Sequence, residues 1–425
     1  MNKHINSILL IILASHLSCN GNLFNDGLND SLTSIPVTGV FLNKSNTSIL
    51  RNSSEQLTAT ITPTYATNKN VTWTTGDLSK ATVTQSGLVT AGNPGTVTIT
   101  VTTNDGGFKA DCTVITERLA GESVIYTAGG VNFNMVYVPA KSFYINVNDS
   151  SSASIVKSFW ICDTEVTYKL WCTVYSWATT DAGGGKRADG GELYYFNYAG
   201  EEGNPDVPAG KTDLHPVTCM NWCDAIVWCN AATEWYNAQN PTNLDCVYTY
   251  TGLIIRDSTF YNMCDGAVQS STANGFRLLT ENEWELAARY INDGNNDGDI
   301  MDAGEYYPGN HASGDTSSYC EPNDSGVSTI FGNYAWYILN SGGSTHEAAA
   351  TSASNHLGLF DMSGNVWEWC FDLSGSQRVI KGGGYNGAAG NLQVGHKWSH
   401  IPWSSTPPTP PDAFIDTGLR IGKTN

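Results

Sequence analysis

Hydrophobic and polar positions alternate with a period of two over residues 36–116. The alternation is clearest in residues 71–74 and 95–101, which are rich in Val, Thr and Ile, and turn residues separate the runs. A period of two puts successive side chains on opposite faces of a strand. We therefore expect these residues to form a separate all-β sandwich domain.

Residues 124–425 have a much less regular pattern. Helical periodicity is limited to residues 223–236 and 281–290. The whole chain contains 43 Gly, 13 Trp and 20 Tyr, which predicts a loop-rich domain packed largely by aromatic rings. After the turn residues 363–365, Trp367 and Trp369 flank Glu368, so we expect a strand with both tryptophans on one face.

The start of the chain has the pattern of an export signal. A lysine precedes the apolar run 8–14, which is too short to span a bilayer as a mature helix. Residues 17–19, Leu-Ser-Cys, resemble a bacterial lipobox, which predicts a lipoprotein-type signal over residues 1–19 with Cys19 lipidated. A plain secretory signal is the alternative. Residues 20–35 are polar and predict a flexible tether, so we expect a lipid-anchored protein of the outer membrane or cell surface.

Charge and cysteine content narrow the class further. The chain of 425 residues carries 21 basic and 40 acidic residues, a net charge of -19, which argues against a nucleic-acid partner. Eleven cysteines leave ten once Cys19 is set aside. An even number in an exported protein predicts disulfides, whose connectivity the sequence does not reveal.

Several motifs of the larger domain, in order along the chain, resemble the formylglycine-generating enzyme, or sulfatase-modifying factor, family. They are Met-Val-Tyr-Val-Pro at 135–139, Glu-Val-Thr at 165–167, His-Pro-Val at 215–217, residues 277–289, residues 358–369 and Thr-Gly-Leu-Arg-Ile at 417–421. The resemblance implies an irregular α+β fold related to C-type lectins over residues 124–425. Residues 36–116 resemble bacterial Ig-like domains of group 2, and a single copy favours a spacer.

The stretch around Glu368 suggests a cation site. Two carboxylates and the backbone carbonyls of a glycine turn suit a hard ion such as calcium. The family resemblance implies structural calcium bound by the side chains of Asp361 and Glu368 and the carbonyls of Gly364 and Val366, with Asn333 at a second site. The alternative is a buried aromatic strand with two solvated acids.

The same resemblance allows the catalytic residues of the family to be compared with this sequence. The family's enzymes hold copper(I) through two cysteines in a motif that begins Gly-Gly-Ser-Tyr, and the matching run here begins at Gly382. The two cysteine positions hold Gly387 and Leu392, which cannot bind copper. We therefore expect no copper and no catalysis, with a formylglycine-generating or related oxidoreductase of the same fold as the alternative.

Residues 386–416 form a Gly-, Pro- and aromatic-rich segment between two motifs of the family. Such a bracketed segment resembles the variable region of retroelement-diversified surface lipoproteins with a lectin-like fold. That resemblance implies a surface for a protein or glycan ligand, lined by Asn386, Gly387, Asn391, Gln393, His396, Trp398, His400 and Trp403. Trp and His suit recognition. The alternative is a loop that packs these aromatics against the domain.

An acidic insertion at residues 293–305 partly matches a calcium-binding EF-hand loop. Asp293, Asn295, Asp297, Gly298 and Ile300 occupy the first, third, fifth, sixth and eighth positions, but the closing Glu305 comes one residue late. Two interpretations are open, a partial calcium loop and a solvated acidic loop, and the late glutamate favours the second.

Overall fold

The computed structural model describes residues 34–204, 210–316, 329–402 and 414–425. These residues form two compact units, whose main boundary along the chain falls between Ile115 and Thr116. In these parts of the chain, no helix combines the length and the apolar character needed to cross a membrane.

The first unit is built from strands alone, as its alternation predicts. The strands are β1 (Gly39–Leu42), β2 (Asn46–Leu50), β3 (Ser54–Gln56), β4 (Ala59–Thr62), β5 (Val71–Thr75), β6 (Ala81–Val83), β7 (Leu88–Ala91), β8 (Gly95–Thr103) and β9 (Lys109–Glu117). They form sheets of order β2-β9-β8-β5, β3-β7-β6 and β1-β4. Val97, Ile99 and Val101 of β8 are buried with Trp73 of β5, so the period-two pattern supplies the core.

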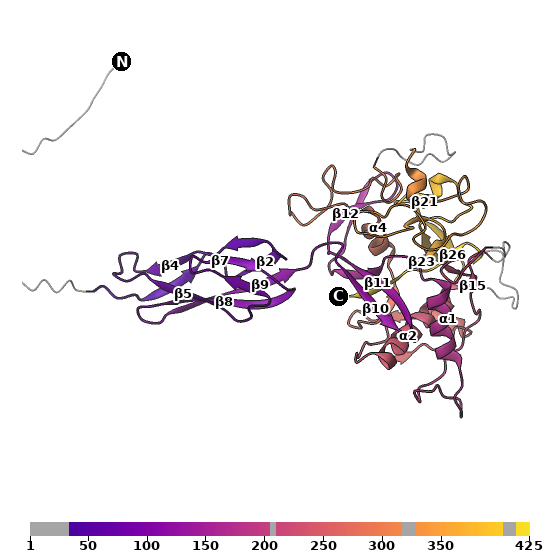
Figure 1. The fold of residues 1–425 in the computed structure, drawn as a ribbon, viewed down its shortest axis with the longest axis horizontal. Coiled ribbons are helices and arrows are strands. Elements are labelled where there is room, and N and C mark those ends of the chain that lie inside the picture. Colours follow the sequence, from indigo (N-terminus) through magenta and orange to yellow (C-terminus); the bar gives the residue numbers. More distant parts are fainter. Residues whose placement is uncertain (1–33, 205–209, 317–328, 403–413) are drawn as a thin grey trace, which may run out of the picture. The chain divides into compact units, whose positions relative to one another are not determined.

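The second unit is organised around an antiparallel sheet of order β10-β11-β14-β27-β20. Figure 1 labels its first two strands, β10 and β11. Its strands are β10 (Ser123–Ala128), β11 (Val131–Val138), β14 (Phe159–Cys162), β20 (Phe276–Leu278) and β27 (Ile421–Thr424). The last strand of the chain lies between β14 and β20, pairing Ile161 with Gly422 and Leu278 with Ile421. The two ends of this unit are thereby held in one sheet.

Three helices with side-chain N-caps pack in this unit: α1 (Tyr168–Thr179), α2 (Trp222–Gln239) and α4 (Glu281–Arg289). Both α2 and α4 begin with a capping box, in which the N-cap side chain and the N3 carboxylate each accept a backbone N–H. Helix α2 is buried on nearly every face, which is typical of a central core helix. Its Trp228 stacks on Trp171 of α1 with ring centroids 5.3 Å apart.

A second sheet of order β25-β24-β23-β26 carries the tryptophan motif. It contains β23 (Trp367–Ser374), β24 (Gln377–Lys381), β25 (Trp398–His400) and β26 (Thr417–Gly418), and β25 is an edge strand. Trp367 and Trp369 are buried in β23, and Trp369 Nε1 donates to Met220 O at 3.4 Å. The predicted strand is present.

The remaining elements are short. They are β12 (Ser142–Ile145), β13 (Ser151–Ser154), β15 (Glu201–Glu202), β16 (Val217–Thr218), β17 (Tyr248–Tyr250), β18 (Leu253–Ile254), α3 (Tyr261–Asp265), β19 (Val268–Gln269), η1 (Phe331–Asn333), β21 (Ala335–Trp336), β22 (Ser363–Gly364) and η2 (Ala389–Leu392).

The cysteines differ from expectation. Nine lie in the described residues, and no disulfide joins any of them. Most are buried, such as Cys229 in α2 and Cys370 in β23, where burial raises the pKa of each thiol. The expectation of disulfides is therefore wrong for these nine, and the buried ones pack as small apolar core residues.

Candidate ligand-binding site

Glu368 does not fit the calcium role that the family resemblance implies. Arg420 donates to both of its carboxylate oxygens, with Arg420 Nη2 2.7 Å from Oε1 and Nε 3.1 Å from Oε2. Trp284 Nε1 donates to Oε2 at 2.6 Å. All three side chains are buried, so a dication would have to displace a paired guanidinium. The structure therefore corrects the role of Glu368 to that of a buried ion-pair partner.

The other residues of the predicted calcium sites also have protein partners or surface positions. Asp361 accepts hydrogen bonds from Ala349 N at 2.7 Å and Thr351 Oγ1 at 3.2 Å, and burial raises its pKa to about 6. Asn333 is exposed, and its carbonyl accepts from Ala353 N. Gly364 and Val366 are buried beside the tryptophan strand. Calcium at these residues remains a prediction.

Within the described ranges, no three His, Cys, Asp or Glu side chains already lie together as a metal-binding group. The resemblance places the copper ligands at positions 387 and 392. Leu392 is fully buried against apolar neighbours such as Phe331 and Tyr337, and Gly387 has no side chain. Neither position offers a sulfur ligand, so these residues do not fit copper.

Sequence reasoning missed the chemistry of Glu165, which entered only as part of a family motif. Its side chain is buried, and neither carboxylate oxygen has a hydrogen-bond partner within the described residues. Burial, followed by the nearby carboxyl of Asp361, raises the pKa of Glu165 well above its ordinary value. A cavity of about 380 Å³ lies against it and is also lined by Asp163 and Asn134.

Hydrogen bonds from other parts of the larger unit fix the main chain of the C-terminal segment. Ser363 Oγ donates to Leu392 O at 2.9 Å, and Val394 N donates to His311 O at 2.8 Å. Lys381 Nζ donates to Val394 O at 3.0 Å. Each of these bonds involves backbone atoms of the segment, so they do not depend on which side chains it carries.

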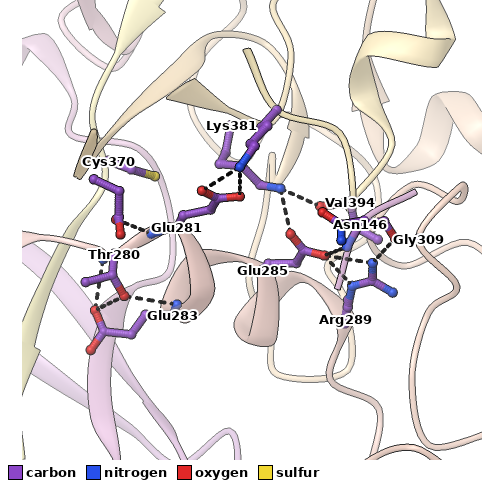
Figure 2. Close-up of polar contacts among 12 residues, drawn as sticks. Asn146, Thr280, Glu281, Glu283, Glu285, Arg289, Gly309, Cys370, Lys381 and Val394 are labelled. Carbon is purple, nitrogen blue, oxygen red and sulfur yellow. Dashed lines mark hydrogen bonds and ion pairs between the residues drawn. The ribbon is translucent and has the colours of Figure 1, made fainter. Parts of the chain in front are cut away.

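Helix α4 supplies the charges that hold Lys381 in place, as Figure 2 shows. Glu285 accepts from Lys381 Nζ at 2.9 Å and from Arg289 Nη2 at 2.7 Å, and all three side chains are buried. Burial alone would raise the pKa of Glu285, but Lys381 and Arg289 outweigh burial and lower it. The acid is therefore a carboxylate that orients both cations.

A close backbone contact fixes the segment at Gly395. Its N–H donates to Gly309 O at 2.8 Å, and a Cβ added there would lie 2.4 Å from the carbonyl carbon of Asn146. Arg289 Nη2 donates to Asn146 O at 2.7 Å, so α4 also holds the opposing backbone (Figure 2). Only glycine fits at this position.

The structure narrows the predicted set of ligand-binding residues. Gly387 and Gln393 are buried, so they do not line a surface, and this part of the prediction is corrected. His396 is partly buried, with its ring centroid 6.1 Å from that of Trp367 and no hydrogen-bond partner for Nε2 in the described ranges. Contacts with distant parts of the chain decide which side chains of this segment are buried, and the local sequence does not show these contacts.

The remaining predicted residues reach solvent. Asn386 is exposed, Asn391 and His400 are half-buried, and Trp398 is 61% exposed on the edge strand β25. An indole with that much open surface is available for contact with a partner. Trp403, like Cys19, lies outside the described residues.

Additional residues join this surface. Asp416 accepts a hydrogen bond from Asn386 and lies near His400; burial raises its pKa, partly offset by Thr417 and Asn386. Ile338 and Leu339 are 52% and 64% exposed, and Ile338 N donates to Gly387 O at 3.1 Å. No local pattern marked these residues, because long-range contacts bring them to the segment.

Comparisons with known proteins agree with this architecture. Residues 122–412 match the sulfatase-modifying factor enzyme 1-like domain, and residues 36–114 match the bacterial Ig-like domain of group 2. The structure of Treponema denticola variable protein 1 is similar, with 26% identity and a TM-score of 0.50, covering 71% of this chain and 99% of that one. The predicted fold class and the resemblance to a variable protein are thus confirmed.

Two curated relatives show different extents of similarity. The chaperone protein LppX of Paenibacillus barcinonensis is 26% identical over 293 residues, which are 65% of this chain and 88% of that protein. An uncharacterized protein of Clostridium acetobutylicum is 36% identical over 126 residues, or 29% of this chain, and the match spans only 13% of its length. Since the sulfatase-modifying factor match spans more than half of the sequence, the chain belongs to the sulfatase-modifying factor enzyme 1-like domain family.

Proposed function

We propose that this chain is a lipid-anchored surface protein that recognises a protein or glycan ligand through its C-terminal segment, without catalysis. The observation that carries the proposal is the division of that segment into fixed and exposed parts. Backbone bonds and the buried Lys381–Glu285 pair hold residues 392–395. Asn386 and Trp398 on either side of them are exposed.

This division suits recognition. A rigid main chain lowers the entropy lost on binding, and an exposed Trp supplies a large contact area with one polar group. The half-buried His400 and the Asp416 carboxyl add hydrogen-bonding capacity beside it.

The binding test uses the fluorescently labelled protein on a printed glycan array and on an array of purified extracellular proteins. We expect a defined set of hits that Trp398→Ala weakens by roughly 10-fold or more, as for an interface anchor. Leu253→Ala is the matched control, because Leu253 is 67% exposed but lies on β18. Equal weakening by both variants would exclude this surface.

The alternative function is oxidation of a sulfatase cysteine to formylglycine. The test is incubation with a cysteine-containing sulfatase peptide and copper, followed by mass spectrometry. We expect no conversion, since Gly387 and Leu392 stand where the family places copper ligands. Conversion of the peptide would overturn the non-catalytic assignment.

The anchor is tested by cell fractionation. In the natural host, we expect wild-type protein in the membrane fraction and Cys19→Ala protein released or unprocessed. Equal membrane association of wild type and a Cys19→Ala variant whose signal has been removed would exclude lipidation at Cys19.

A further inference from the structure

The acidic insertion at residues 293–305 is closed at its base by backbone contacts. Tyr290 and Tyr306 form an antiparallel bridge, and the N–H groups of Ile291 and Asn292 donate to Glu305 O at 2.9 and 3.2 Å. The closure brings the first and last acids of the loop, Asp293 and Glu305, to the same end. The fold therefore places Glu305 next to the start of the loop, although Glu305 comes one residue late in the sequence pattern.

These two acids are not solvated, contrary to the favoured interpretation of the sequence. The side chain of Asp293 is 7% exposed and Glu305 is 6% exposed. Glu305 Oε1 accepts from Gly294 N at 2.7 Å, and Asp293 Oδ2 pairs with Lys141. Within the described residues, Asp293 Oδ1 and Glu305 Oε2 have no hydrogen-bond partner. Buried carboxylate oxygens without partners are costly unless an ion or water fills the site.

The middle of the loop shares three features with an EF-hand loop. Gly298, at the sixth position, has φ +99°. Ile300, at the eighth, is fully buried, and its N–H donates to Ser142 O at 3.0 Å. Asn295 Oδ1 accepts from Asp297 N at 3.0 Å, so the third and fifth positions turn toward each other. The residue types and the closure both suit an oxygen-binding cation.

We propose that residues 293–305 form a calcium site, in which Asp293 and Glu305 provide buried carboxylate ligands and Asn295 and Asp297 complete the shell. Asn295 and Asp297 are exposed, and in the proposed site their side chains turn toward the two buried acids. Calcium suits this set better than magnesium because it accepts more oxygen ligands in a less rigid geometry. The site is independent of the proposed ligand-binding function.

Lys141 provides the competing explanation, in which its ammonium is the only cation that the loop requires. Its contact is with Asp293 Oδ2, which leaves Oδ1 without a partner in the described structure. The two explanations differ in what removal of the lysine does. A competing ammonium weakens calcium binding, so Lys141→Met should bind calcium more tightly.

The test is isothermal titration of the EDTA-treated protein with calcium chloride and, separately, magnesium chloride. We expect calcium binding that Glu305→Gln and Asp297→Asn each weaken by roughly 10-fold or more, and that Lys141→Met strengthens. Asp213→Asn, an exposed acid elsewhere, is the control and should bind as the wild type.

Several results would overturn the site. The first is that wild-type protein binds no calcium. The second is that Glu305→Gln binds calcium as tightly as wild type. The third is that Asp361→Asn loses calcium binding whereas Glu305→Gln keeps it. Thermal unfolding of each variant in EDTA separates a lost ligand from a lost fold. Asp297→Asn, at an exposed position, keeps the test valid if the buried Glu305→Gln variant does not fold.

Discussion

At the scale of single residues, the larger unit places charged groups in its interior and gives most of them a partner. Arg420 and Glu368 form a fully buried pair between segments that lie far apart in the sequence. Glu165 lies close to them, without a hydrogen bond in the described ranges. The two acids should therefore respond in opposite ways to removal of their charge.

Glu368→Gln tests the correction of the calcium role. We expect the variant to lose about 3 to 5 kcal/mol of unfolding free energy, because Arg420 would be left as an unpaired buried charge. Urea unfolding at pH 7 measures this, in EDTA and in calcium. The loss should be the same in both. A loss that is seen only in calcium would restore Glu368 as a calcium ligand.

Glu165→Gln tests the unpartnered acid. The folded-state pKa of Glu165 is raised above the ordinary value of 4.5, so the native state binds its proton more tightly than the unfolded state. This contribution to stability is present below pH 4.5 and is lost as pH rises toward the folded pKa. We expect Glu165→Gln to gain stability relative to wild type, by about 1 kcal/mol or more, between pH 5 and 8. A difference that is constant across this range would contradict the expected titration.

At the scale of elements, helix α4 connects the core to the candidate binding surface. Its Glu285 holds Lys381 of β24, and Lys381 in turn holds the carbonyl of Val394 (Figure 2). The sequence predicted α4 from its motif but gave no sign of this pairing, because the partners are 96 residues apart. The burial of Gln393 and the position of Asp416 next to Asn386 and His400 also depend on contacts between residues far apart in the sequence.

Lys381→Met tests this connection. We expect a loss of about 3 kcal/mol, since the buried carboxylate of Glu285 would lose one of its two cations and Val394 O would lose its donor. Lys397→Met is the matched control, because Lys397 pairs with Glu281 at a half-exposed position and should cost less than about 1 kcal/mol. Equal losses in the two variants would contradict a special role for Lys381.

At the scale of the whole molecule, the chain combines two units that the sequence predicts with different success. Period two in residues 95–101 locates the buried face of β8 directly. In the second unit, motifs predict the fold class, but the insertion of β27 between β14 and β20 has no local signal. Surface and core positions within 386–400 are likewise decided by the tertiary frame, so the ligand-binding set was only partly predictable.

The division into two units has a thermodynamic consequence. Trp73 is buried in the first unit, and Trp73→Ala should cost about 3 to 5 kcal/mol in that unit alone. Differential scanning calorimetry should show two transitions for the wild type, of which the variant lowers only one. A shift of both transitions would mean that the units unfold cooperatively.

The proposed recognition depends on an anchored main chain and exposed side chains in the C-terminal segment. The most direct test is a scan of all substitutions at residues 381–401. Surface display with a thermal challenge measures folding for each variant. We predict that Asn386 and Trp398 accept nearly every residue, whereas Lys381 and Gly395 accept almost none. Equal intolerance at exposed and anchored positions would contradict the account, because the segment would then be part of the core.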